Sequence, residues 1–358
     1  MISENWRNKI SNTAQLGGIE TSVLDNGAGR GTRIAWINTG TGLRFKVVID
    51  RGMDIADAFY NHQSIAWLSH SGVTAPERFS NQGIDWLKTF GGGLLTTCGL
   101  THVGGPESDE FGSRGLHDQI SNIRAEVESI IQPDIRAGKL EMSITGRIKQ
   151  SQVLGPALEL KRTISATLGK PTVKIHDEVT NYGNSKAPHM LLYHFNFGWP
   201  MVDDGTDIIW KGEWRPREGG INDEIFREGY NFRKCTEPLA EHNANGEAVA
   251  FIDAEPDSSG MCSCALFNAK INIAMIMRFQ KKQLPWLTNW QHWGRGEYVT
   301  GVEPGTHPPI GQARAREENS LIFLEAGETR TYDVEIEITE DNAQIDQLLA
   351  DHQLTTNN

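Results

Sequence analysis

The sequence has no apolar run long enough to cross a membrane. Its longest apolar stretches, such as "NIAMIM" at 272–277, are far shorter than the roughly 20 residues that span a bilayer. The start, "MISENWRNKI", contains no apolar segment typical of a secretion signal. We therefore expect a cytoplasmic protein with no membrane partner.

Clustered positive charge and cysteine are also scarce. The chain has 34 Lys and Arg against 46 Asp and Glu, a formal net charge of −12, which excludes the basic surface that nucleic acid requires. Four cysteines in 358 residues are too few for a disulfide framework. Cys262 and Cys264 are too close in sequence for a typical zinc or redox pair. We interpret the cysteines as small buried residues or isolated surface thiols.

Few segments show the periodicity of a helix, and most show the alternation of apolar and polar residues that is typical of a strand. We expect one or two helical turns within 77–90 and a terminal helix at about 341–354. Apolar and polar residues alternate in "LRFKVVID", "KLEMSITGRIKQ", "TVKIHDEVTN" and "RTYDVEIEITE", which predicts half-buried antiparallel strands. The pattern indicates an all-β protein with few short helices.

No composition break or internal repeat divides the chain. We predict one β-sandwich domain over 1–358, with a short N-terminal arm at about 1–15. The glycine cluster "NGAGRGT" at 26–32 precedes an alternating segment instead of a helix, so we expect a hairpin turn there and no phosphate loop. A second cluster, "FGGGLLTTCGLTHVGGP" at 90–106, is expected to form a tight irregular crossing.

The segment "LLYHFNFGWP" at 191–200 places polar residues within an aromatic strand. Alternation puts Tyr193, Phe195, Phe197 and Trp199 on one face, and His194, Asn196 and Gly198 on the other. The aromatic face is expected to enter the core. The second face is polar and is a candidate site.

Two further residues could join His194 in such a site. His117 lies in "RGLHDQISN", after a glycine-rich approach. Glu303 shares a strand face with Val299 and Gly301, so its carboxylate is predicted to have a raised pKa suited to a base, before Pro304 ends the pairing. Each of these three residues could instead be a structural, hydrogen-bonded group.

Five segments in order resemble the aldose 1-epimerase (galactose mutarotase) superfamily and its DUF4432 branch: "GGGLLTTCGL", the "LH" of "GLHDQISN", "DEVTNYG", "LLYHFNFGWP" and "GVEPGT". The resemblance implies a galactose mutarotase-like β-supersandwich of mostly antiparallel strands with a concave sugar site. It also implies that His194 is the general acid, Glu303 the general base and His117 a second substrate-binding residue. Asp118 follows His117 where this branch has glycine, so the local geometry is expected to differ.

Four other residues are candidates for substrate binding. Arg51, in "DRGMDI", resembles a polar signature of the branch, although it could equally form a structural ion pair with Asp54. Asn196 and His102 are polar residues near the motifs. Trp290, together with Trp286 and Trp293, could provide an apolar platform for a sugar or simply pack the sheet.

These features predict an aldose 1-epimerase that interconverts sugar anomers through ring opening. The chemistry requires a base and an acid, which we expect on opposite sides of the sugar ring, and no cofactor or metal. The expected partner is a small-molecule sugar, with a possible homodimer. Two alternatives stay open: a carbohydrate-binding protein without turnover, and a metal-dependent lyase or isomerase with ligands from His102, His117, His194, Glu303 and His307.

Overall fold

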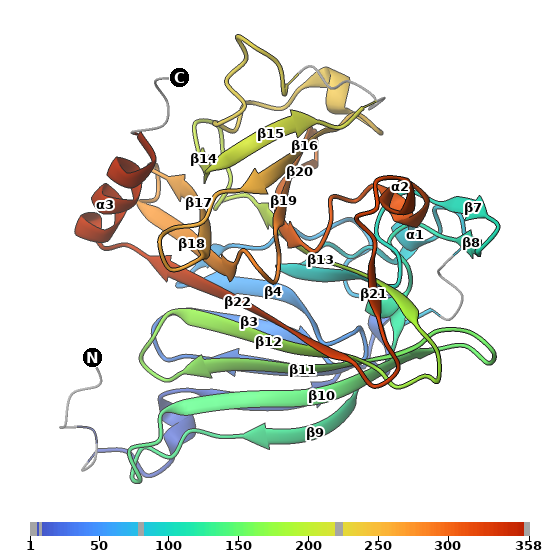
Figure 1. Cartoon of the computed structure of the whole chain (residues 1–358). Coiled ribbons are helices and arrows are strands. Elements are labelled where there is room, and N and C mark those ends of the chain that lie inside the picture. Colours follow the sequence, from blue (N-terminus) through green and yellow to red (C-terminus); the bar gives the residue numbers. More distant parts are fainter. Residues whose placement is uncertain (1–5, 7–8, 78–81, 219–224, 354–358) are drawn as a thin grey trace.

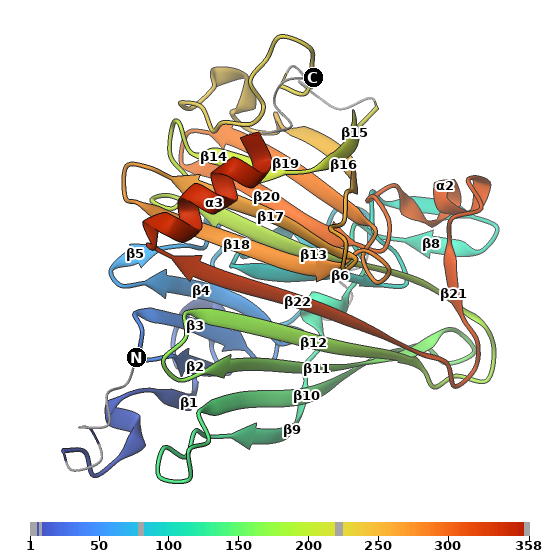
Figure 2. The same ribbon diagram turned by 60° about the vertical axis from the view of Figure 1, so that its left-hand side comes forward.

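Two large antiparallel sheets face each other across the core (Figures 1 and 2). The computed structural model describes residue 6 and residues 9–77, 82–218 and 225–353. Strands make up 48% and helices 10% of the structure, far from the roughly 20 to 25% strand of an average domain. The predicted all-β class, with mostly antiparallel strands, is confirmed.

In the described residues the larger sheet has twelve strands. Their order across the sheet is β1 (Gly18–Val23), β2 (Arg33–Asn38), β3 (Leu43–Val48), β4 (Asp54–Tyr60), β6 (Leu95–Leu100), β13 (Ala187–Gly198), β20 (Glu297–Gly305), β19 (Trp286–Gly294), β16 (Ala248–Ala254) and β15 (Gly212–Pro216). Strand β5 (Gln63–Ser64) pairs with β4, and β21 (Ile322–Leu324) pairs with β13.

The second sheet has eight strands within the described ranges. Their order is β14 (Asp207–Trp210), β17 (Met261–Asn268), β18 (Ile273–Gln280), β22 (Thr329–Thr339), β12 (Thr172–Asn181), β11 (Ala157–Thr167), β10 (Glu141–Ser151) and β9 (Glu126–Ile131). A separate hairpin joins β7 (Glu107–Asp109) and β8 (Gly112–Arg114). All four segments with predicted alternation form strands: β3, β10, β12 and β22.

Helices are short and peripheral. They are α1 (Trp86–Thr89), α2 (Gly311–Glu317) and α3 (Asn342–Gln353), with single 3₁₀ turns at Thr13–Gln15, Gly27–Gly29, Ile120–Asn122 and Ala240–His242. Helix α3 packs Ile345 and Leu348 onto the outer face of the second sheet (Figure 2). Both α1 and α3 lie within the predicted helical segments, although 78–81 and 354 are outside the described residues. None of the described helices is both long and apolar enough to cross a membrane.

The two glycine clusters have different outcomes. Residues 26–32 join β1 to β2, which pair as an antiparallel hairpin, as predicted. The second cluster was expected to form a tight irregular crossing, but within it Leu95–Leu100 is a fully buried strand at the centre of the larger sheet. Its small and β-branched residues let β4 and β13 pair closely on either side.

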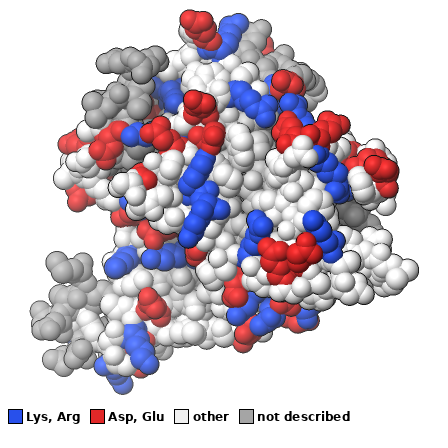
Figure 3. Space-filling model, viewed as in Figure 1, with Lys and Arg blue, Asp and Glu red and all other residues white. Residues whose placement is uncertain are grey.

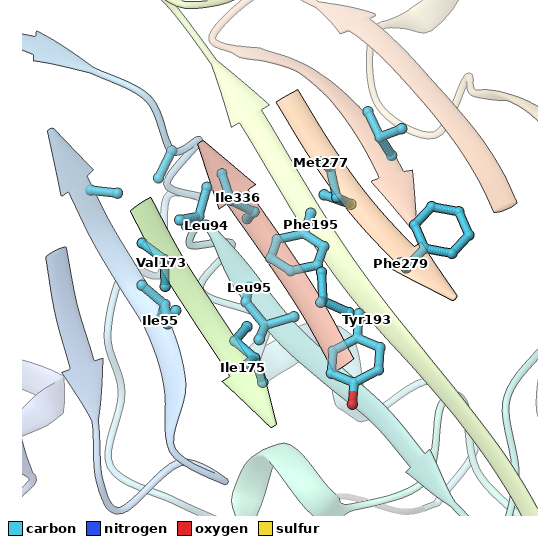
Figure 4. Packing of buried hydrophobic residues seen from close by; sticks show 14 of the residues in the cluster. Ile55, Leu94, Leu95, Val173, Ile175, Tyr193, Phe195, Met277, Phe279 and Ile336 are labelled. Atoms are coloured by element: carbon cyan, nitrogen blue, oxygen red, sulfur yellow. The ribbon is translucent and has the colours of Figure 1, made fainter. Parts of the chain in front are cut away.

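The aromatic face of β13 enters the sandwich core as predicted, with one exception. Tyr193 and Phe195 lie among Ile175, Ile336 and Met277 from the opposite sheet (Figure 4). Trp199 was expected on the same face, but β13 ends at Gly198 and the Trp199 side chain is exposed. The face of His194 points the other way, out of the core.

A buried charge cluster between the two sheets holds β13 in place on its core side. Arg162 is fully buried and donates to both oxygens of Asp177 at 2.9 and 2.7 Å. The same guanidinium donates to Asp54 at 3.2 Å, which links β11 to β4 of the other sheet. The Tyr193 hydroxyl donates to Asp177 at 2.6 Å, so the residue before His194 is anchored.

The four cysteines are all free and buried, as expected.

Candidate active site

A cavity of about 630 Å³ opens on the face of the larger sheet that points away from the core. Its floor comes from β13, β19 and β20, and its wall comes from α1 and the segments 67–71 and 244–247. The size is within the range of small-molecule sites, about 300 to 1,000 Å³. The aromatic residues of the lining are Trp67, Trp86, Phe90 and Trp290.

His194 projects from β13 into an aromatic surround. Its ring centroid lies 5.2 Å from that of Phe90, 5.4 Å from that of Trp290 and 6.1 Å from that of Trp86. Burial among these apolar rings lowers the pKa of His194 to about 4, because it disfavours the imidazolium. The rings therefore surround the imidazole, and burial favours its neutral form.

Glu303 is on β20 and lies beside His194 of the neighbouring strand β13. Gly301, two residues earlier on the same face, makes room for the carboxylate: a Cβ there would be 2.2 Å from Glu303 Oε1. Burial raises the pKa of Glu303 well above its usual value, and the negative charge of Glu247 adds to this shift. The raised pKa was predicted, but Pro304 does not end the strand, because pairing with β19 continues to Gly305.

His194 and Glu303 form one proton-binding pair. Nδ1 of His194 is 3.4 Å from Oε1 of Glu303, and neither atom has a hydrogen-bond partner in the described structure. Burial raises the pKa of the carboxyl and lowers that of the imidazole, so it favours the neutral form of both groups. We expected the two groups on opposite sides of a sugar ring, but they lie side by side.

His117 reaches the cavity from an unusual turn. His117 and Asp118 both have left-handed backbone conformations, with φ of 56° and 61°. The Asp118 carboxylate accepts from the backbone and hydroxyl of Thr101 and from Gln150, at 3.1, 2.6 and 2.6 Å. These bonds hold Asp118 in the left-handed region, at the position where glycine is typical of the branch.

The turn directs the His117 ring at the other cavity residues. Its centroid is 6.0 Å from that of His194 and 4.9 Å from that of Trp86. Nδ1 has no hydrogen-bond partner in the part of the chain that the structure describes. Burial lowers the pKa of His117 well below its usual value, so the ring is neutral and free to bond a ligand.

Of the three candidate tryptophans on β19, Trp290 lines the cavity. Its indole Nε1 donates to Glu247 at 2.8 Å, which fixes the ring plane. Trp293 is on the opposite face of the strand and is fully buried in the core. Trp286 is on the same face as Trp290 but is not part of the lining.

Arg51, Asn196 and His102 do not line the cavity. Arg51 donates to Thr74 Oγ1 at 2.7 Å and to the carbonyl of Thr89 at 3.0 Å, so it ties down the end of α1. The Asn196 amide donates to the carbonyls of Gly93 and His194, at 3.0 and 2.9 Å. The Arg51 guanidinium and the Asn196 amide nitrogen are thus engaged by neighbouring protein groups, and neither residue is brought to the cavity that contains His194 and Glu303.

His102 and His307 are likewise tied to backbone carbonyls. His102 Nε2 is 2.8 Å from the Gly105 carbonyl, and His307 Nε2 is 2.8 Å from that of Ser320. Within the described ranges no group of three or more His, Cys, Asp or Glu side chains is arranged to hold a metal ion. The five residues considered as metal ligands are therefore not brought together as one set.

Sequence reasoning missed several residues of the lining. His292 and Glu297 are in phase with Trp290 and Glu303, so extending the same alternation along β19 and β20 would have found them. Trp86 and Phe90 are four residues apart at a helical turn, a spacing that indicates a shared face. Arg217 and Glu247 carry no local signal, because only the folding of distant segments brings them to the wall.

Solved structures with the same fold support this architecture. A "putative aldose 1-epimerase" from Klebsiella pneumoniae subsp. pneumoniae is similar, with a TM-score of 0.83 and 23% identity over 97% of this chain and 92% of that one. A galactose mutarotase-like protein from Clostridium acetobutylicum has a TM-score of 0.61 and 11% identity, over 90% and 98% of the two chains. One from Lactobacillus casei has a TM-score of 0.54 and 13% identity, over 86% and 100%.

At these identities the likeness shows a galactose mutarotase-like fold. A search of curated protein sequences gave no match. Residues 29–338 match the sequence profile of DUF4432, a domain of unknown function. Because this match covers most of the chain, the protein belongs to the DUF4432 family.

Proposed function

We propose that this protein is an aldose 1-epimerase, which interconverts sugar anomers at the Glu303–His194 pair. The observation that carries the proposal is the pair itself: two buried titratable groups at the floor of an aromatic-lined cavity, whose facing atoms Nδ1 and Oε1 are 3.4 Å apart and have no hydrogen-bond partner among the described residues. Such groups are costly to bury unless a ligand uses them. The names of the structurally similar proteins from Klebsiella and Clostridium support the same reaction class.

The pair supplies both proton transfers of ring opening. In the reactive form Glu303 is a carboxylate and His194 an imidazolium, which arises when the proton crosses the 3.4 Å gap between them. Glu303 then takes the proton of the anomeric hydroxyl while His194 donates one to the ring oxygen, and the bond between carbon 1 and that oxygen breaks. Both side chains end neutral, in the forms that burial favours.

Neighbouring groups suit this chemistry as well as opposed ones. The anomeric oxygen and the ring oxygen are bonded to the same carbon, so an acid and a base side by side can reach both. After ring opening, rotation about the bond between carbons 1 and 2 presents the other face of the aldehyde. Ring closure returns the two protons by the reverse path and forms the other anomer.

The surrounding residues would bind and orient the sugar. Trp290 offers an apolar face whose orientation Glu247 fixes, and sugars pack their C–H faces on such rings. The neutral imidazole of His117, with a free Nδ1, can bond a sugar hydroxyl. Trp86 and Phe90 exclude water from the pair, which strengthens electrostatic interactions inside.

Polarimetry across a panel of aldoses tests the proposal. We expect Glu303→Gln and His194→Gln each to lower turnover by about 10² to 10⁴-fold, the usual contribution of a positioned acid or base. The double variant should be little worse than either single one, because the two groups act as a unit. Glu213→Gln, at an exposed position on β15, is the matched control and should keep the full rate.

Two outcomes would redirect the interpretation. If the wild type accelerates no anomer exchange but still binds sugars by calorimetry, the cavity serves binding alone. If exchange is fast and both single variants keep it, the pair is not the reacting centre. Circular dichroism on each variant separates loss of chemistry from loss of fold.

A further inference from the structure

The cavity extends well beyond the Glu303–His194 pair. Its floor follows β19 and β20, where Thr288 is opposite Glu303 and Gly294 is opposite Glu297. Both Glu303 and Glu297 line the cavity, and six residues of extended chain separate them, which corresponds to about 20 Å. This is far longer than a single sugar ring, so a monosaccharide at the pair leaves the other end empty.

The distant end presents hydrogen-bond acceptors. Nδ1 of His292 lies 2.6 Å from the Gly246 carbonyl, which can only accept, so the hydrogen is on Nδ1 and Nε2 is an acceptor when the ring is neutral. Glu297 lies 3.9 Å from this Nε2 and 3.8 Å from Nε2 of His70. No Lys or Arg of the described residues lies within ion-pair distance of Glu297. The carboxylate is therefore available to a donor.

The charge at this end argues against an anionic ligand. Arg217 is the one Lys or Arg in the described cavity lining, and it is paired with Glu247 at 2.8 Å. Glu247 also accepts from the Trp290 indole, so both of its oxygens are engaged. With this pair neutralised, Glu297 gives the outer end negative character. A phosphate or carboxylate would be repelled there, whereas hydroxyl groups, which donate, would be bonded.

An aromatic surface connects the two ends. The Trp290 ring centroid is 5.4 Å from that of His194 on one side and 6.2 Å from that of His292, nearly parallel, on the other. A ligand that runs along β19 would therefore pass the rings of His194, Trp290 and His292 in turn. Stacking against successive rings is how proteins bind sugar units whose C–H faces are apolar.

We infer that the outer end, formed by His292, Glu297 and His70, binds a second, uncharged sugar unit, so that the substrates are reducing disaccharides or longer saccharides. The inference rests on the proposed function for the orientation of the chain, with the reducing end at Glu303. The hydroxyl groups of the second unit donate to Glu297 and to Nε2 of His292, above the indole of Trp290.

Comparison of mono- and disaccharides tests the inference. We would measure anomer exchange for glucose, galactose, maltose, cellobiose and lactose, with wild type, Glu297→Gln and Glu297→Ala, and with Glu213→Gln as the matched control. We expect at least one disaccharide to exceed its reducing-end monosaccharide in kcat/KM. Each Glu297 variant should lower that value by about 10- to 100-fold, the range for one hydrogen bond to a charged group, and leave the monosaccharide unchanged.

A binding experiment separates this inference from the proposed reaction. Methyl glycosides of the same disaccharides cannot open their reducing-end ring, so calorimetry with them reports binding alone. Weaker binding to the Glu297 variants than to the control supports the outer site even if the wild type shows no anomer exchange. Equal binding by all variants, or an equal effect of the variants on mono- and disaccharides, would overturn the inference.

Discussion

Gly301→Ala should reduce catalysis by displacing Glu303 while leaving every titratable group in the cavity present. The added Cβ would lie 2.2 Å from Glu303 Oε1, closer than Cβ atoms of folded proteins approach other atoms, and 3.3 Å from Trp290 Cβ, which is a tight contact. The carboxylate must therefore move by about 1 Å or more, and a displacement of this size can cost 10²-fold in rate. We expect turnover to fall by about that factor, with a loss of stability of about 1 to 3 kcal/mol from overpacking.

Polarimetry gives the rate, and thermal unfolding gives the stability. Gly155→Ala is the matched control, because Gly155 is in a loop away from the cavity and its added Cβ would have no contact shorter than 3.2 Å, to Gln152. The control should keep the full rate and nearly the full stability. A Gly301→Ala protein that folds and turns over at the wild-type rate would refute the requirement for a closely placed carboxylate.

Three further outcomes are expected. Burial raises the pKa of Glu303, so the contribution of this carboxyl to stability falls as pH rises above 4.5, whereas the lowered pKa values of His194 and His117 act in the opposite direction in wild type and variant alike. The stability of Glu303→Gln relative to the wild type, measured by thermal unfolding, should therefore increase as pH rises. Arg162→Met leaves Asp177 and Asp54 buried without their cation and should cost about 3 to 5 kcal/mol in urea unfolding, whereas Arg147→Met, at an exposed pair, should cost far less. Chelator should leave anomer exchange unchanged, and elemental analysis should find substoichiometric metal.

The strands were predictable because alternation is a local property. In β10 and β22 each apolar residue that alternation assigned to the core is buried, since a shift of one residue would expose the whole set. Strand ends were harder to predict. Trp199 continues the alternation of β13 but lies beyond its end, and Pro304 lies within β20, in register with Leu287 of β19.

The site was predictable where a residue interrupts the pattern of its own strand. His194 and Glu303 were identified as polar residues on otherwise apolar or aromatic strands, and the structure brings them together. The partners of Arg51 could not be read from its neighbours, because Thr74 and Thr89 are more than 20 residues away. Glu247 lies at the cavity for the same reason, through the pairing of β16 with β19.

The distribution of charge on the surface does not indicate where the functional site lies. On the face seen in Figure 3, Lys and Arg are interspersed with Asp and Glu. Elsewhere in the contacts of the described residues, Arg278 pairs with both Glu335 and Glu337. Ion pairs at the surface contribute little to stability. The chemistry of this protein is therefore expected from its buried titratable groups.

Proton NMR of an aldose in D₂O, with and without the protein, tests the central claim most directly. Magnetisation transfer between the two anomeric protons measures their exchange rate. If Glu303 and His194 open and close the ring, this rate should rise in proportion to the wild-type concentration, and the protons on carbons 1 and 2 should both be retained. No acceleration for any aldose, or loss of the carbon 2 proton to solvent, would contradict the proposed reaction.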